Sequence, residues 1–79
     1  MPTMAHTQLK SFREELVPKV AQEDLAHMAG LRVGTYRNIE QGRNVSYTKA
    51  KAILGALNKI RVERGISEVT LDDLGLNIV

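Results

Sequence analysis

Cysteine is absent from this chain of 79 residues. Without thiols the chain can form neither a disulfide framework nor a thiolate zinc site, and it is compatible with a reducing cytosol. His6 and His27 stand apart in the sequence, so they predict no metal site either, and we expect no cofactor.

Long apolar runs are missing as well. No run approaches the ~20 residues of a membrane span, and the opening residues MPTMAHTQ lack the basic and apolar regions of a signal peptide. We therefore expect a soluble protein of the cytoplasm and nucleoid, with no membrane partner.

The sequence also lacks the patterns of an active site. It has no Ser/His/Asp or Cys/His set, no glycine-rich phosphate loop and no HExxH spacing. We expect His27 to be exposed, without a charged partner at helical spacing. These absences favour a binding protein over an enzyme.

The length allows one domain over residues 1–79, with a small core. Charge is uneven along it: residues 1–64 hold all 11 Lys and Arg and six of the nine acids, a net charge of +5, whereas residues 65–79 have a net charge of −3. This asymmetry favours a polyanionic partner, with the tail (66–79) turned away from it. Residues 1–6 are expected to be a flexible start.

Apolar periodicity predicts an all-α fold, a compact bundle of about five short helices. Leu9, Phe12 and Leu16 form the inner face of a first helix that ends before Pro18. Ser46 is the expected N-cap of a fourth helix, whose inner stripe is Ala50, Ile53, Leu54, Leu57 and Ile60. Residues 70–73, TLDD, resemble a capping box that begins a short fifth helix.

The segment from Gln22 to Arg43 predicts two more helices around a tight turn. On the first of them, Ala26 keeps the helices close because a larger side chain would overpack. Gly30 can adopt the left-handed conformation that ends this helix, and Leu31 plugs the turn. The other inner residues of the two helices are Leu25, Ala29, Tyr36 and Ile39.

Two short helices around a tight turn are typical of DNA-binding proteins, in which the second helix enters the major groove. The second helix here, from about Val33 to Gln41, should therefore lie in that groove, because only the major groove admits a helix and distinguishes every base pair. Its outer face carries Thr35, Arg37, Asn38 and Gln41. The amide of Asn38 can pair with the edge of adenine; the alternative is an exposed asparagine without a partner. Arg37 and Arg43 would contact bases or phosphates, or else remain solvated.

These residues resemble the Cro/repressor-type (Xre-like) helix-turn-helix regulators of phages, plasmids and bacteria. The resemblance runs from Leu9 to Leu57 and implies a lambda-repressor-like DNA-binding domain. Its best pieces are Arg13, Gln22–Leu25–Ala26, Ala29–Gly30–Leu31 and Ile39–Glu40–Gln41–Gly42–Arg43.

The chain also departs from that family. Val33 and Gly34 stand where polar base-reading residues are common: Val33 could pack on a thymine methyl and Gly34 could bring the backbone near the groove, unless the helix starts later. Arg32 replaces a small polar cap, and Ala21 cannot cap the preceding helix. Two residues are inserted around residues 17–19.

The resemblance assigns further roles. Gln22 is similar in place to a glutamine that contacts phosphate, and Glu40 is expected to form a structural ion pair with Arg13. Tyr36 would be a core residue, with its hydroxyl within reach of a phosphate. The expected phosphate contacts are Gln22, Arg32, Thr35, Gln41 and Arg43, and the expected base readers are Val33, Gly34, Arg37 and Asn38.

The sequence thus predicts a sequence-specific regulator, a repressor, that binds a double-stranded DNA operator as a homodimer. The tail would supply the dimer surface through Val69, Leu71, Leu74, Leu76 and Ile78, unless these residues pack on their own chain. An alternative function is the DNA-binding antitoxin of a toxin–antitoxin pair, with a toxin as protein partner. A third is a DNA-binding module of a larger assembly.

Overall fold

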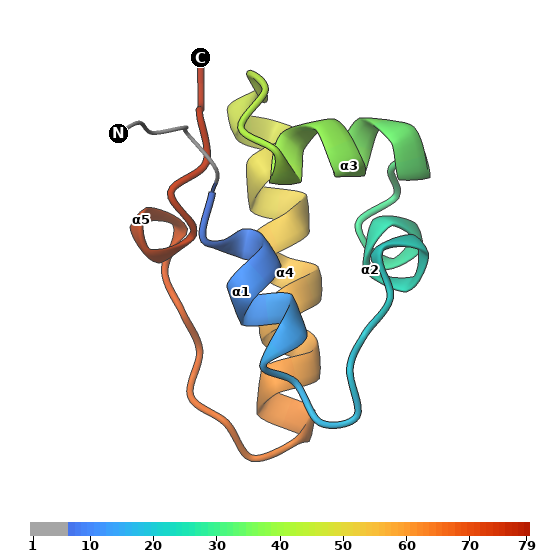
Figure 1. Cartoon of the computed structure of the whole chain (residues 1–79). Coiled ribbons are helices and arrows are strands. Elements are labelled where there is room, and N and C mark those ends of the chain that lie inside the picture. The colour runs from blue at the N-terminus through green and yellow to red at the C-terminus, as the bar shows by residue number, and fades with distance from the viewer. Residues whose placement is uncertain (1–6) are drawn as a thin grey trace, which may run out of the picture.

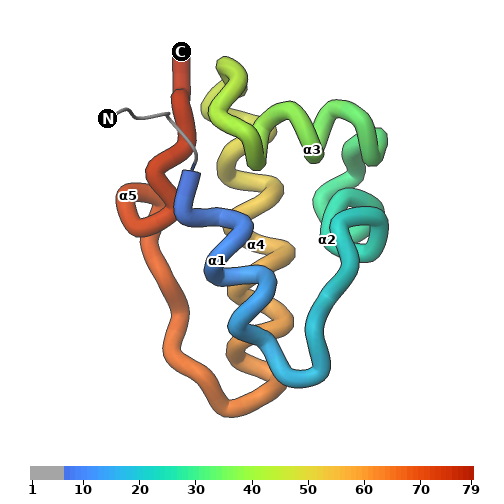
Figure 2. Tube along the Cα trace, in the orientation of Figure 1, coloured from blue at the N-terminus to red at the C-terminus, as the bar shows by residue number. Residues whose placement is uncertain are grey.

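The computed structural model describes residues 7–79, so the expected flexible start at residues 1–6 lies outside the described residues. In the described range the chain forms helices and no extended sheet. The helices are α1 (Leu9–Glu14), α2 (Gln22–Met28), α3 (Val33–Glu40), α4 (Tyr47–Glu63) and α5 (Leu71–Leu74). The long α4 stands at the centre, with the other four around it (Figures 1 and 2). None of the helices in residues 7–79 is both long and apolar enough to cross a membrane.

The helix boundaries follow local chemistry. Ser46 caps α4 by accepting the N–H of Lys49, and Thr70 forms a full capping box with Asp73 at the start of α5. Gly30 follows α2 with a φ of +73°, a conformation that a glycine adopts without strain. The all-α class and the predicted order of helices are confirmed.

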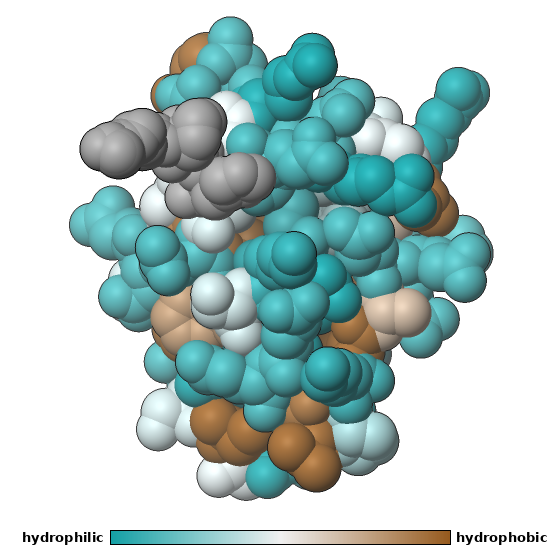
Figure 3. Space-filling model, in the orientation of Figure 1, coloured by the Kyte–Doolittle hydropathy of each residue, from teal (hydrophilic) through white to brown (hydrophobic). Residues whose placement is uncertain are grey.

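One core holds the helices together around α4. Ala26 on α2 is fully buried, as its role in close helix packing requires. Phe12 on α1 is half-buried against the same core. The largest fully buried side chains come from every helix and the loop after α1: Leu9, Leu16, Leu25, Tyr36, Ile53, Leu57 and Leu74. In Figure 3 hydrophilic side chains cover most of the visible face, and hydrophobic ones gather near its lower end.

The tail folds back onto its own chain. Leu74 has no exposed surface, and its carbonyl accepts the N–H of Gln8 at 2.9 Å. The expectation that Leu74 forms part of a dimer surface is therefore wrong, because its side chain is already enclosed by the domain. Most of the other expected dimer residues are half-buried against the same core, and these are Val69, Leu71 and Leu76.

The end of the tail runs beside the loop between α3 and α4. Val45 N–H donates to Asn77 O at 3.0 Å, and Val79 N–H donates to Val45 O at 3.1 Å, which makes a short parallel bridge between Val45 and Ile78. The Asn77 amide also donates to Asn44 Oδ1 at 2.6 Å. This end of the tail thus lies beside the loop that follows α3, and its expected turn away from a polyanionic partner stays a prediction.

Candidate nucleic-acid interface

Helix α3 lies at the edge of the domain, across one end of α4 (Figure 1). The helix begins at Val33, so the alternative of a later start is wrong. Its N-cap, Arg32, has extended backbone and makes no side-chain hydrogen bond to the helix. One face is buried through Tyr36, Ile39 and Glu40. The opposite face exposes Arg37, Asn38 and Gln41, with Thr35 half-buried beside them. Helical periodicity alone produces this division.

The first two residues of α3 differ in their surroundings. Val33 is half-buried and packs against the core, so part of its side chain serves the fold. Gly34 is exposed, and a Cβ added there would meet nothing within 4 Å. Packing within the chain therefore gives no reason for a glycine at this position. Base contacts by Val33 and Gly34 stay predictions.

A hollow of about 190 Å³ separates the C-terminal half of α3 from the start of α4. Asn38 lies on its α3 side, and Arg43 and Lys49 bring two positive charges to it. The remaining lining residues are Thr35, Ile39, Asn44, Val45 and Ser46. The exposed polar face of α3 thus continues into a concave, cationic surface.

Four of the basic residues gather near α3. Arg32, Arg37, Arg43 and Lys49 are exposed on it or next to it. Two other arginines donate to backbone carbonyls. Arg64 donates to Pro18 O at 2.6 Å, and Arg61 donates to Ser67 O at 2.7 Å while its guanidinium lies 5.5 Å from the centre of the Phe12 ring. Positive charge near α3 is therefore available to a polyanion.

The expected ion pair between Arg13 and Glu40 is present. Arg13 Nε lies 2.9 Å from Glu40 Oε2, and the two side chains are only 9% and 3% exposed. Arg13 also donates to Val20 O at 3.0 Å, which fixes the loop between α1 and α2. The hydrogen bond from Arg13 to Glu40 raises the pKa of the guanidinium, so the pair stays ionised.

Glu40 is the acceptor for three side chains. Its oxygens accept from Arg13, from Tyr36 Oη at 2.8 Å and from Gln22 Nε2 at 2.8 Å. Burial alone would raise the pKa of Glu40, but these hydrogen bonds outweigh it and hold the pKa below the usual value. Burial, reinforced by the charge of Glu40, raises the pKa of Tyr36. The expected reach of the Tyr36 hydroxyl to a phosphate is wrong, because that hydroxyl donates to Glu40.

Gln22 is bound within the protein at both ends of its amide. Besides its bond to Glu40, its Oε1 accepts from Arg37 Nε at 3.2 Å. A phosphate contact by this side chain stays a prediction. The spacing of Tyr36 and Glu40, four residues apart on one helix, could have revealed their contact from sequence. The convergence of Gln22 on Glu40 joins two helices and has no such local signal.

Three features together define a helix-turn-helix domain: two short helices around a left-handed glycine, an exposed second helix with a polar face, and a cationic surface beside it. The family model for helix-turn-helix domains of the Cro/C1 type (HTH_3) matches residues 18–62. The chain therefore belongs to this family of DNA-binding, Xre-like transcription regulators. Comparison with curated proteins and with solved structures gave no match.

Proposed function

We propose that this chain is a sequence-specific repressor, without catalytic activity, that binds a palindromic operator as a homodimer. The observation that carries the proposal is the exposed face of α3, where Arg37, Asn38 and Gln41 lie next to the cationic hollow. A helix placed in the major groove would bring Asn38 to base edges, while Arg43 and Lys49 meet the flanking phosphates.

The contacts sort into two kinds. Asn38 carries no charge and can donate to and accept from one base, so it would specify sequence. Arg32, Arg43 and Lys49 would release counterions at phosphates and so supply affinity that depends on salt. Thr35 and Gln41, at the two ends of the outer face, would fix the position of α3 on the backbone.

Selection of bound fragments from random duplex DNA, at several stated salt concentrations, tests this proposal. We expect a two-fold symmetric site whose half-sites lie about one helical turn apart. Recovery of unrelated sequences would contradict sequence-specific recognition and favour a general DNA-binding module. Recovery of a single half-site would contradict the homodimer.

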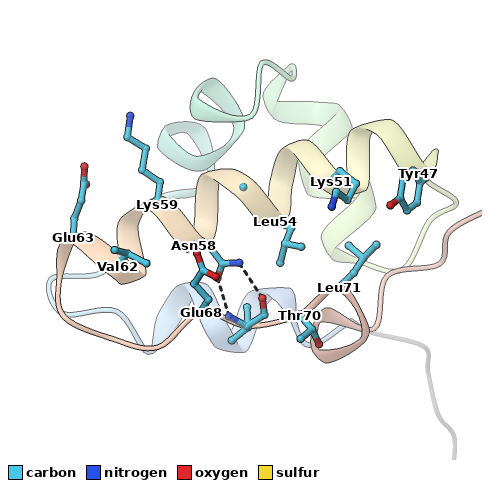
Figure 4. A pocket seen from close by; sticks show the side chains of 12 residues that line it. Tyr47, Lys51, Leu54, Asn58, Lys59, Val62, Glu63, Glu68, Thr70 and Leu71 are labelled. Carbon is cyan, nitrogen blue, oxygen red and sulfur yellow. Dashed lines mark hydrogen bonds between the residues drawn. The ribbon is translucent and has the colours of Figure 1, made fainter.

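A groove of about 790 Å³ along α4 supports a second copy as the dimer partner. Tyr47 and Val62 are 58% and 55% exposed there, so the groove offers apolar surface that a second copy could cover. Asn58 on its floor bonds Val69 through both amide atoms, which joins the segment before α5 to α4 (Figure 4). The other apolar lining residues are Leu54 and Leu71. Of the residues expected in the dimer surface, Val69 and Leu71 line this groove.

Charge favours a copy of the same chain in this groove. Lys51 lies toward one end of the groove and Glu63 toward the other (Figure 4). An antiparallel pairing of two α4 helices about the middle of the groove would place each Lys51 beside Glu63 of the other copy. A two-fold interface requires such a self-complementary patch. Lys51 also lies 6.0 Å from the centre of the Tyr47 ring, so the apolar and charged parts of the groove adjoin.

A further inference from the structure

Gln22 stands between the buried ion pair and the exposed face of α3. Its Nε2 donates to Glu40 Oε1 at 2.8 Å, and its Oε1 accepts from Arg37 Nε at 3.2 Å. Gln22 is half-buried, whereas Arg37 is exposed. An unbroken series of hydrogen bonds therefore runs from Arg13 through Glu40 and Gln22 to Arg37.

Glu40 determines which way the Gln22 amide faces. An ionised carboxylate accepts hydrogen bonds and donates none, so the NH₂ group of Gln22 must face it. Glu40 cannot turn away, because Arg13 donates to it through both Nε and Nη2 and Tyr36 donates through its hydroxyl. The carbonyl oxygen of Gln22 is consequently held outward, toward Arg37.

An outward carbonyl attracts a donor and repels a phosphate oxygen. The partner that it binds, Arg37, carries five N–H donors in a planar fork, of which this bond uses one. The other four remain for DNA. Because a long arginine side chain loses rotamer freedom when it binds, an arginine already held in place binds with a smaller entropic cost.

We propose that Gln22 is a positioning residue for Arg37, which it holds by Nε so that the rest of the guanidinium meets the operator. This inference rests on the proposed function, since it assigns Arg37 a contact in the same DNA complex. It replaces a direct phosphate contact by the Gln22 side chain with an action through a neighbouring helix.

A double-mutant cycle tests the proposal, with Gln22→Met, Arg37→Ala and the double variant titrated with the selected operator. Gln22→Met should weaken binding by about 2- to 10-fold, the effect of leaving one long side chain to be ordered on binding. In the Arg37→Ala background the same change should have no further effect. Gln8→Met is the matched control, because Gln8 is exposed at the start of α1. The operator affinity of this variant should equal that of the parent.

A second measurement uses the free protein. The Nε–H of Arg37 should exchange with water more slowly than that of the exposed Arg32 in ¹⁵N spectra, and Gln22→Met should abolish the difference. Arg37→Lys, a change on the surface that should leave the fold intact, keeps the charge but lacks this N–H. It should lose at least as much operator affinity as Gln22→Met does, because it also lacks the planar fork that meets DNA. If Gln22→Met proves too unstable to titrate, the exchange rates of Arg37 and Arg32 in the parent and the operator affinity of Arg37→Lys still test the proposal.

The outcomes separate this inference from the proposed function. If Gln22→Met weakens binding equally with and without Arg37, Gln22 contacts DNA itself and the positioning role is wrong. An unchanged affinity in Gln22→Met, or equal exchange rates at Arg37 and Arg32, would also overturn it. In each of these cases the parent still binds its operator. If the parent binds no duplex, the proposed function fails and this inference fails with it.

Discussion

At the scale of single residues, Glu40 joins the fold to the exposed face of α3. Its carboxylate accepts from Arg13, Tyr36 and Gln22 and is almost fully buried. An acid on a helix that faces phosphate would be repelled if it were exposed, so its inward position removes that repulsion. The same position makes the fold depend on it, because loss of one side of a buried pair leaves the other charge unpaired.

We expect Glu40→Ala to lower the free energy of unfolding by about 3–5 kcal/mol at neutral pH, because Arg13 would remain buried without its partner. Urea denaturation measures the change. Glu14→Ala, which removes an exposed acid from α1, is the control and should change stability by less than about 0.5 kcal/mol. Equal midpoints for the two variants would contradict the structural role of the pair.

The stabilisation by Glu40 should depend on pH. Its folded-state pKa is held below the ordinary value of about 4.3. The contribution is therefore fully present above that value and is lost as pH falls through the folded pKa. The difference in unfolding free energy between the parent and Glu40→Ala should be constant from pH 7 to about pH 5 and shrink at lower pH. A difference that grows on acidification would contradict this sign.

Asn38 and Arg43 should separate the two kinds of DNA contact. Asn38→Ala should relax the preference at one base of each half-site, at a cost of about 1–3 kcal/mol on the operator and almost none on random duplex. Arg43→Ala should weaken binding to both duplexes alike and reduce the slope of log affinity against log salt by about one. Titrations on both duplexes at several salt concentrations measure these effects. Equal loss on both duplexes for Asn38→Ala would make it a backbone contact.

At the scale of helices, α5 contributes a fully buried side chain to the core. The short helix places Leu74 against the helices that precede it, and the Gln8 N–H bond to its carbonyl ties it to α1. Truncation before residue 69 would remove this side chain. The shortened chain should accordingly lose stability.

Leu74→Ala should lower the free energy of unfolding by about 2–5 kcal/mol, because the smaller side chain leaves a cavity at a fully buried position. Ile78→Ala is the matched control: its side chain is 37% exposed, and it should cost less than about 1 kcal/mol. Thermal or urea unfolding measures both. If the two variants unfold together, α5 is not part of the cooperative core.

Local chemistry made much of this fold predictable. Ser46, Thr70 and Gly30 act on neighbouring backbone, so their roles could be predicted from sequence and are observed. The destination of the tail could not be predicted, since apolar residues on a short helix fit equally well against their own chain or a second copy. The link from Gln22 to Arg37 was equally hidden, because it depends on how α2 and α3 meet in space.

At the scale of the whole molecule, the two candidate surfaces have separate compositions. The surface proposed to face DNA is polar and cationic through Asn38, Arg43 and Lys49, whereas the groove along α4 is apolar with charges of both signs at its rim. A polyanion favours the first and a self-complementary chain favours the second. Under the proposed function, binding DNA and pairing with a second copy would therefore use different residues and could be altered independently.

The groove residues should decide whether the chain pairs. We expect the parent to sediment as a dimer at micromolar concentration and Lys51→Glu to sediment as a monomer, because the new acid would face Glu63 of the other copy. Lys51→Glu combined with Glu63→Lys should restore the dimer, since the exchanged charges attract again. Lys19→Glu makes the same charge change in the exposed loop after α1 and should leave the dimer intact.

On a palindromic operator Lys51→Glu should bind far more weakly than the parent, while its affinity for a single half-site is unchanged. A parent that remains a monomer at these concentrations, or a combined variant that does not recover the dimer, would show that the groove is not the surface where two copies meet.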